Sequence, residues 1–150
     1  MRADGTAIEC LLYAYAERID AGDFAGVAAL FADGEIRAGE HGPAFRGADA
    51  VRRLYESTVR LYADGTPRTK HVTTNVIVDV DESAGTATAR SYFSVLQQLD
   101  DFPLQVIVAG RYHDTFARVD GRWRFAVRRM HVDLQGDLRR HLLIDLPRSG

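Results

Sequence analysis

The spacing of the hydrophobic residues changes near residue 66, and this change limits the folds that the chain can adopt. Before it, apolar residues recur every three or four positions, as in Ile8, Leu12 and Tyr15, which is typical of amphipathic helices. After it, apolar and polar residues alternate, as from His71 to Val80, which is typical of strands. Helices followed by an antiparallel set of strands predict the α+β class.

Glycine, proline and aspartate divide the chain into expected elements. We expect helices with apolar faces at 6–19, 24–31 and 48–62, and a last short helix at 137–146. Asp23 is the expected N-cap of the second helix. Short strands are expected at 35–38 and around Phe45. A four-stranded antiparallel meander is expected at 71–80, 86–99, 104–118 and 122–132.

The length and charge of the chain restrict its organisation and its partners. A chain of 150 residues fits one ordinary domain, so we expect a single domain over 1–150, with a core at about 6–133 and a tail at 134–150. The net charge is −2, with acids and bases interspersed. No basic stripe could follow a phosphate backbone, so we expect no nucleic-acid partner.

The sequence also predicts where the protein resides. No apolar run approaches the roughly 20 residues that cross a bilayer, so we expect no membrane partner. The first residues lack the basic and apolar blocks of a secretory signal, and we therefore expect a cytoplasmic protein. Cys10 is the single cysteine. Because Ile8, Leu11 and Leu12 surround it, we expect a buried thiol that behaves as a small hydrophobe.

Three segments carry a resemblance to a known superfamily: 12–31, 70–78 and 110–129. With the order of elements, they make the chain similar, over about residues 8–132, to the SnoaL-like (nuclear transport factor 2-like) superfamily. The resemblance implies a cone-shaped α+β barrel, in which N-terminal helices pack on a curved antiparallel sheet around one pocket. Because this fold hosts dehydratases, isomerases, cyclases, hydrolases and non-catalytic subunits, function has to be argued from the site.

Within the superfamily, the chain most resembles the branch of scytalone dehydratase, lindane dehydrochlorinase and bile-acid dehydratases. The resemblance implies three catalytic residues: Asp20 after the first helix, His71 early in the first long strand, and Tyr15 five residues before the aspartate. It also implies a basic residue after the last strand's tryptophan. Arg128 matches that position best, and Arg129 is the alternative.

The chain departs from this branch at one position. Scytalone dehydratase carries a second histidine on the next long strand, and residues 86–99 contain none. This difference argues against the specific dehydration of a naphthalenone-type substrate.

The residues implied by the resemblance form a plausible base. Asp20 would accept a hydrogen bond from one ring nitrogen of His71 and stabilise the imidazolium that forms when the other nitrogen takes a proton. Tyr15 would donate to a developing oxyanion or to a leaving hydroxyl. Each residue has an alternative structural role: Asp20 as a turn cap, His71 as a surface or core histidine, and Tyr15 as a core aromatic.

Strict alternation predicts which residues of the first long strand face the pocket. His71, Thr73 and Asn75 would share a polar face, while Val72 and Val76 would lie on the opposite face. A polar strand face inside a cone would suit a ligand pocket.

These features together favour a cofactor-independent dehydratase or isomerase. Its substrate would be a small hydrophobic cyclic molecule, polyketide- or steroid-like, and we expect a homodimer or homotrimer. Alternatives are a polyketide-type cyclase with the same pocket, and a non-catalytic protein that binds a small ligand or resembles a dioxygenase small subunit. No histidine pair at ligand spacing, second cysteine or glycine-rich phosphate loop indicates a metal or cofactor.

Overall fold

The computed structural model describes residues 2–147, in which helices and short strands precede four long strands. The helices are α1 (Arg2–Asp20), α2 (Phe24–Ala29) and α3 (Gly47–Thr58). The strands are β1 (Glu35–Ala38), β2 (Ala44–Arg46), β3 (Thr69–Asp81), β4 (Thr86–Leu99), β5 (Phe102–Val119) and β6 (Arg122–Gln135). The domain expected over 1–150 includes residues 1 and 148–150, which lie outside the described residues.

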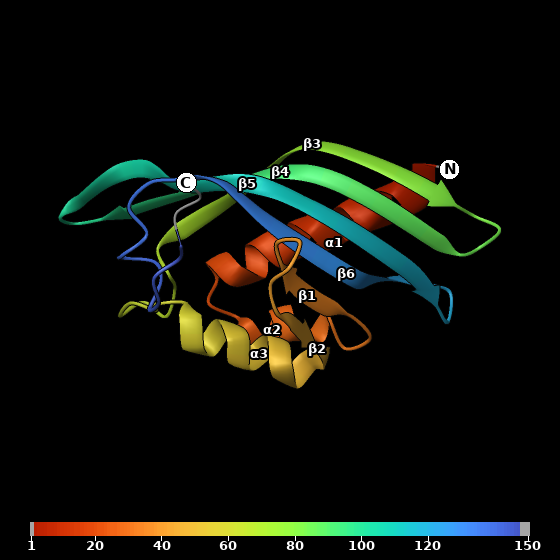
Figure 1. Ribbon diagram of the computed structural model, residues 1–150, viewed down its shortest axis with the longest axis horizontal. Coiled ribbons are helices and arrows are strands. Elements are labelled where there is room, and N and C mark those ends of the chain that lie inside the picture. Colours follow the sequence, from red (N-terminus) through yellow and green to blue (C-terminus); the bar gives the residue numbers. More distant parts are fainter. Residues whose placement is uncertain (1, 148–150) are drawn as a thin grey trace.

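The six strands form one curved sheet with the order β2-β1-β6-β5-β4-β3. Neighbouring strands are antiparallel, except β1 and β6, which are parallel. Figure 1 shows the long strands as one layer, with α1 crossing beneath them and α2 and α3 further out beside β1 and β2. The α+β class with N-terminal helices on a curved sheet is therefore confirmed. The sheet curves without closing on itself.

The core lies between the helices and the sheet, and α1 supplies one side of it. Ile8, Leu12 and Ile19 recur at helical spacing and are at most 1% exposed. Fully burying a side chain of this size contributes about 1.5–3 kcal/mol. Cys10 follows Ile8 by two residues, about 200° around the helix, and is exposed. The expectation of a buried thiol was wrong because the apolar neighbours of Cys10 in sequence lie on another face.

Asp23 confirms the predicted start of α2. Its Oδ1 accepts a hydrogen bond from the backbone N–H of Gly26 at 2.8 Å, which satisfies one of the free amides at the helix start. An N-cap of this kind is worth about 1 kcal/mol. Since Asp20 ends α1 only three residues earlier, the cap also fixes the direction in which the chain leaves the site described below.

The segment after β6 contains a single turn at 139–141 and an isolated bridge, so the helix predicted at 137–146 was wrong. Val59 forms a β-bridge with Leu142, and the Leu143 amide donates to the Thr58 carbonyl at 2.9 Å. The same pairing explains why α3 ends at Thr58, four residues before its predicted end. Backbone groups that pair across the two segments are unavailable for helical hydrogen bonds, and tertiary pairing thus overrides local propensity.

A bulge in β3 determines which of its side chains face inward. Asn75 has φ 55°, and the register between β3 and β4 shifts there. Asparagine enters this left-handed region more readily than most residues. Because a bulge inserts one residue, His71 and Val76 face inward on either side of it. Strict alternation was therefore wrong: Val72, on the other face from His71, is 40% exposed and does not share a face with Val76.

No helix within residues 2–147 is both long and apolar enough to cross a membrane. The cytoplasmic location stays a prediction of the sequence.

Candidate functional site

A cavity of about 340 Å³ lies between the helices and the concave face of the sheet. Most of its wall is apolar and comes from helices, long strands and the C-terminal segment, including Leu54, Phe93, Val108, Val132 and Leu142. The titratable side chains on the wall are Tyr15, Tyr55, His71, Tyr112 and His141. An apolar hollow with a few convergent polar groups is the usual form of a small-molecule site.

Asp20 links the end of α1 to the start of β3. Its Oδ1 lies 2.6 Å from Nδ1 of His71 and accepts a hydrogen bond from the Thr69 hydroxyl at 3.0 Å. Its Oδ2 accepts the backbone N–H of His71 at 2.8 Å. These contacts offset the unfavourable position of a carboxylate at a helix C-terminus. The structure thus brings together two residues that are 51 positions apart in the chain.

The contact with Asp20 also defines what His71 presents to the cavity. A carboxylate acceptor places the ring proton on Nδ1 and leaves Nε2 able to accept a proton. The side chains of His71 and Asp20 are 9% and 10% exposed, and His71 lines the cavity. The imidazole is therefore held on one side by a carboxylate and open to a ligand on the other.

Tyr15 and Tyr55 form a second polar position on the cavity wall. Their hydroxyls are hydrogen-bonded to each other, and the Tyr15 hydroxyl also contacts Sδ of Met130 at 3.6 Å. Burial raises the pKa of both tyrosines, although Arg128 partly offsets the rise for Tyr15. Both are consequently neutral hydroxyl donors near neutral pH. Sequence reasoning missed Tyr55, since its helical spacing does not distinguish a hydroxyl partner from an ordinary core aromatic.

Arg128 lies behind the wall of the cavity. It makes two hydrogen bonds to Asp114, at 2.9 and 3.0 Å, and both side chains are 0% exposed. Its guanidinium lies 3.6 Å from the ring centre of Tyr112 and 4.3 Å from that of Tyr15, and these two rings line the cavity. Of the two arginines predicted as candidates, Arg128 is the inward one. Arg129 donates to a backbone carbonyl after β1.

The electrostatics of this buried pair favour its charged form. Burial raises the pKa of Asp114, and Arg128 opposes that rise through its charge and its hydrogen bonds. Burial also disfavours the charged form of Arg128, but Asp114 outweighs it, so the pKa of the guanidinium lies above its ordinary value. A permanent positive charge therefore lies against the faces of Tyr15 and Tyr112.

His141 is a further residue of the cavity that the sequence did not reveal. It lies in the C-terminal segment, is 6% exposed, and its ring centre is 6.1 Å from that of His71. Burial lowers its pKa to about 4, with His71 acting in the same direction and Asp20 opposing. The second histidine of the cavity wall thus comes from the C-terminal segment, which was predicted to be helical, and not from β4.

Within residues 2–147, no group of three His, Cys, Asp or Glu side chains could hold a metal ion. The independence from metal and cofactor expected from the sequence stays a prediction.

The comparison with protein families decides where the chain belongs. The family profile of the SnoaL-like domain matches residues 2–129. The chain belongs to the SnoaL-like family. This result confirms the resemblance found in the sequence. No match was found among the curated proteins.

Solved structures share the shape of this SnoaL-like domain. A Mycobacterium tuberculosis protein of unknown function is 28% identical, with 87% of this chain and 72% of that one covered and a TM-score of 0.72. A candidate scytalone dehydratase from Novosphingobium aromaticivorans is 25% identical, with 90% and 87% covered and a TM-score of 0.70. ActVI-ORFA from Streptomyces coelicolor, at 22% identity, 87% and 98% coverage and a TM-score of 0.70, shows the fold alone.

Proposed function

We propose that this SnoaL-like domain is a cofactor-independent dehydratase or isomerase that uses Asp20 and His71 as its base. Its substrate would be a small hydrophobic cyclic molecule, polyketide- or steroid-like. The observation that carries the proposal is the His71 imidazole, which contacts a nearly buried carboxylate on one side and an apolar cavity on the other. The similarity to a candidate scytalone dehydratase also supports a dehydratase.

In the proposed reaction, Nε2 of His71 takes a proton from a carbon next to a carbonyl group. The electron pair of the broken C–H bond forms a carbon–carbon double bond, and a neighbouring hydroxyl leaves with a proton as water. In an isomerisation, the proton returns to a different carbon instead. Asp20 stabilises the imidazolium, and a well-placed acid or base contributes about 10²–10⁴-fold.

The pair of Tyr15 and Tyr55 would donate a hydrogen bond to a substrate oxygen from the second polar position. Burial keeps both hydroxyls neutral, and because one of them donates to the other, one proton of the pair is left for the substrate. Arg128 enters the proposal as a positioning residue that acts through Tyr15, since its guanidinium lies over that ring and is not among the residues that line the cavity. Its charge favours the transfer of the Tyr15 proton toward a leaving oxygen.

The same base and cavity would also serve a polyketide-type cyclase, in which the carbanion attacks a second carbonyl of the same substrate. This alternative differs from the dehydratase in the substrate and not in the residues. A non-catalytic ligand-binding protein, or a partner resembling a dioxygenase small subunit, would need no base at all. Turnover therefore separates the catalytic proposals from the non-catalytic alternatives.

The test is turnover of one- to three-ring cyclic β-hydroxy ketones, followed by enone absorbance and by deuterium uptake at the α-carbon in D₂O. His71→Ala and Asp20→Asn should each lower the rate by about 10²–10⁴-fold. Lys70→Gln, which changes the exposed neighbour of His71 on β3, should leave it unchanged. Equal turnover by wild type and both site variants would rule out the base. Absence of deuterium uptake in wild type would favour a ligand-binding protein.

We also propose that the protein forms a homodimer or homotrimer. The outer face of the sheet exposes apolar side chains, including Ile77 at 46%, Tyr92 at 53% and Val106 at 54%. Pairing this face with a second copy would remove apolar surface from water. Light scattering coupled to size-exclusion chromatography would test the proposal, and a monomer at tens of micromolar would contradict it.

A further inference from the structure

His141 is a buried polar residue whose hydrogen-bonding capacity is not satisfied within the protein. It is 6% exposed, and its Nδ1 has no hydrogen-bond partner within residues 2–147. A buried polar atom without a hydrogen-bond partner destabilises a fold. Nearly all buried polar atoms in native structures therefore have a partner. Nδ1 itself has almost no accessible surface, so Nε2 is the ring nitrogen that can meet a molecule in the cavity.

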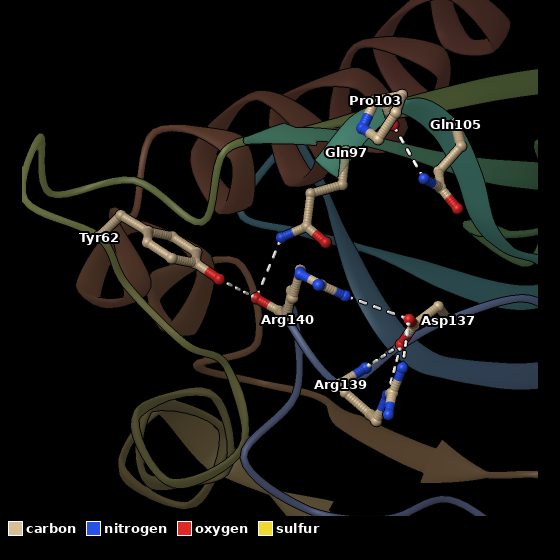
Figure 2. A network of polar contacts seen from close by, with 7 residues as sticks. All are labelled: Tyr62, Gln97, Pro103, Gln105, Asp137, Arg139 and Arg140. Atoms are coloured by element: carbon tan, nitrogen blue, oxygen red, sulfur yellow. Dashed lines mark hydrogen bonds and ion pairs between the residues drawn. The ribbon is translucent and has the colours of Figure 1, made fainter. Parts of the chain in front are cut away.

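The backbone next to His141 is held by hydrogen bonds, and Figure 2 shows those made by Arg140. The carbonyl of Arg140 accepts hydrogen bonds from the Tyr62 hydroxyl at 2.5 Å and from Nε2 of Gln97 at 3.1 Å. The carbonyl of His141 itself accepts the Arg60 amide at 2.8 Å. A side chain that is to contact a ligand needs such rigid support. The C-terminal segment is therefore anchored at the point where it enters the cavity wall.

His141 and His71 are close enough to contact the same functional group. Their ring centres are 6.1 Å apart, and a nitrogen reaches a reacting atom over about 3 Å. One ring can therefore contact a carbonyl oxygen while the other contacts the carbon next to it. His71 has a carboxylate partner, whereas no hydrogen bond of the His141 ring to a carboxylate is found among the described residues. The two histidines are therefore suited to different tasks.

We propose that His141 contacts the substrate and donates a hydrogen bond from Nε2 to the carbonyl oxygen of a cyclic ketone, while His71 removes the proton from the adjacent carbon. This assignment rests on the proposed function and narrows it. The substrate is a cyclic β-hydroxy ketone whose carbonyl lies at the histidine end of the cavity. Its leaving hydroxyl lies at Tyr15 and Tyr55.

The charge state of His141 agrees with this role. Burial and the neighbouring His71 lower its pKa to about 4, against the opposing effect of Asp20, so the ring is neutral near pH 7. A neutral imidazole presents one N–H to an oxygen, and its hydrogen bond strengthens as negative charge develops on that oxygen. It does so without adding a second positive charge beside the imidazolium that forms on His71.

The test uses two probes of nearly equal shape, 1-tetralone and its hydrocarbon tetralin. Wild type should bind the ketone roughly five- to tenfold more tightly, as expected for one hydrogen bond. The infrared C=O band of bound 1-tetralone should move to lower frequency. His141→Phe should abolish both effects, whereas Tyr15→Phe and the matched exposed control His113→Phe should retain them.

Two further measurements separate a lost contact from a misfolded variant. Thermal unfolding of His141→Phe should occur at or above the wild-type temperature, because the substitution removes an unpaired buried nitrogen. In wild type, the ¹⁵N resonance of His141 Nε2 should shift on addition of 1-tetralone and not of tetralin, and this measurement needs no variant.

Two outcomes would overturn this assignment. One is equal affinity of wild type for the ketone and the hydrocarbon. The other is a shifted C=O band that survives in His141→Phe and disappears in Tyr15→Phe, which would place the carbonyl at the tyrosines. Because 1-tetralone has no leaving group, its binding is independent of turnover. A protein that shows the expected contact but does not turn over hydroxy ketones would support the contact at His141 and contradict only the proposed base.

Discussion

Two carboxylates of this protein each hold a basic side chain, but the two pairs differ in what they can do. Asp20 contacts His71 at 2.6 Å, and Asp114 contacts Arg128 at 2.9 Å. His71 lines the cavity, and an imidazole can gain and lose a proton under ordinary conditions. Arg128 is 0% exposed and remains charged. We therefore assign proton transfer to the first pair and support to the second.

This comparison shows that a short distance between acid and base does not by itself identify a catalytic pair. Access to the cavity and the ability of the donor to change its protonation state separate the two. The buried pair still influences the cavity through Tyr15, whose ring lies 4.3 Å from the guanidinium. Its effect on the reaction is therefore indirect, whereas its effect on stability is direct.

The largest expected effect concerns the buried pair. Asp114→Ala should lower the free energy of unfolding by about 3–5 kcal/mol, because it leaves the charge of Arg128 buried without a partner. Urea denaturation measures this difference. The double variant Asp114→Leu with Arg128→Met should recover much of the loss, since it removes both charges. If Asp114→Ala lowers the free energy of unfolding by less than about 1 kcal/mol, the pair of Asp114 and Arg128 does not support the fold as stated above.

The next effect is the pH dependence of stability that comes from His141, which lies beside His71. The pKa of His141 falls from its ordinary 6.5 to about 4 on folding, so the unfolded chain binds its proton more readily. The stability linked to His141 is therefore fully present above pH 6.5 and is lost as the pH falls toward about 4. The loss should reach about 3 kcal/mol at roughly 1.4 kcal/mol per pH unit. The groups that face His141 and modulate this loss are His71 and Asp20.

Other acids also titrate over this range, so the measurement needs a reference. His141→Phe retains those acids and lacks the imidazole. The pH dependence of its unfolding free energy should be flatter than that of wild type between pH 6.5 and 4. Parallel curves for the two proteins would show that His141 does not titrate as the structure implies.

A smaller change in stability is expected at the first pair itself. Asp20→Asn keeps the shape of the side chain and one acceptor, and should lower the free energy of unfolding by only about 1–2 kcal/mol. If the proposed function is correct, the same variant loses about 10²–10⁴-fold in rate. Comparing urea denaturation with turnover separates the two effects. A loss of activity that merely follows the unfolded fraction would give Asp20 a structural role only.

The smallest effect concerns the segment that brings His141 beside His71. Tyr62→Phe removes one of the two hydrogen bonds to the Arg140 carbonyl, and should cost about 1 kcal/mol of stability. Its preference for 1-tetralone over tetralin should fall between those of wild type and His141→Phe. Tyr13→Phe is the matched control, because Tyr13 is 42% exposed on α1. If Tyr13→Phe loses as much stability and ketone preference as Tyr62→Phe, the hydrogen bond from Tyr62 to the Arg140 carbonyl does not position His141.

The elements with strong local signals were predictable from the sequence. The apolar stripe of α1, the cap at Asp23 and the limits of β4 were all found there, because each depends on residues that are neighbours in the chain. The predictions were wrong where distant segments pair. The end of α3 and the shape of the C-terminal segment depend on the bridge between Val59 and Leu142, for which no local pattern exists.

The candidate site divides in the same way. Asp20, His71 and Tyr15 came from the resemblance, and the structure places Asp20 against His71 and Tyr15 on the same cavity wall. Nothing in the sequence pointed to Tyr55 or His141 as polar groups of that wall. Tyr55 lies on a helix face whose spacing indicates only burial, and His141 follows two arginines in a segment that was predicted to be helical.

The sequence by itself determined the order of helices and strands as far as β6, the apolar stripe of α1 and the family, because these depend on periodicity and on short motifs. Only the tertiary structure decided which polar side chains meet. The bulge at Asn75 decides which side chains after His71 share its face of β3. The pairing between Val59 and Leu142 places His141 on the cavity wall. Contacts between residues that are far apart in the chain depend on register and curvature, which are properties of the assembled sheet.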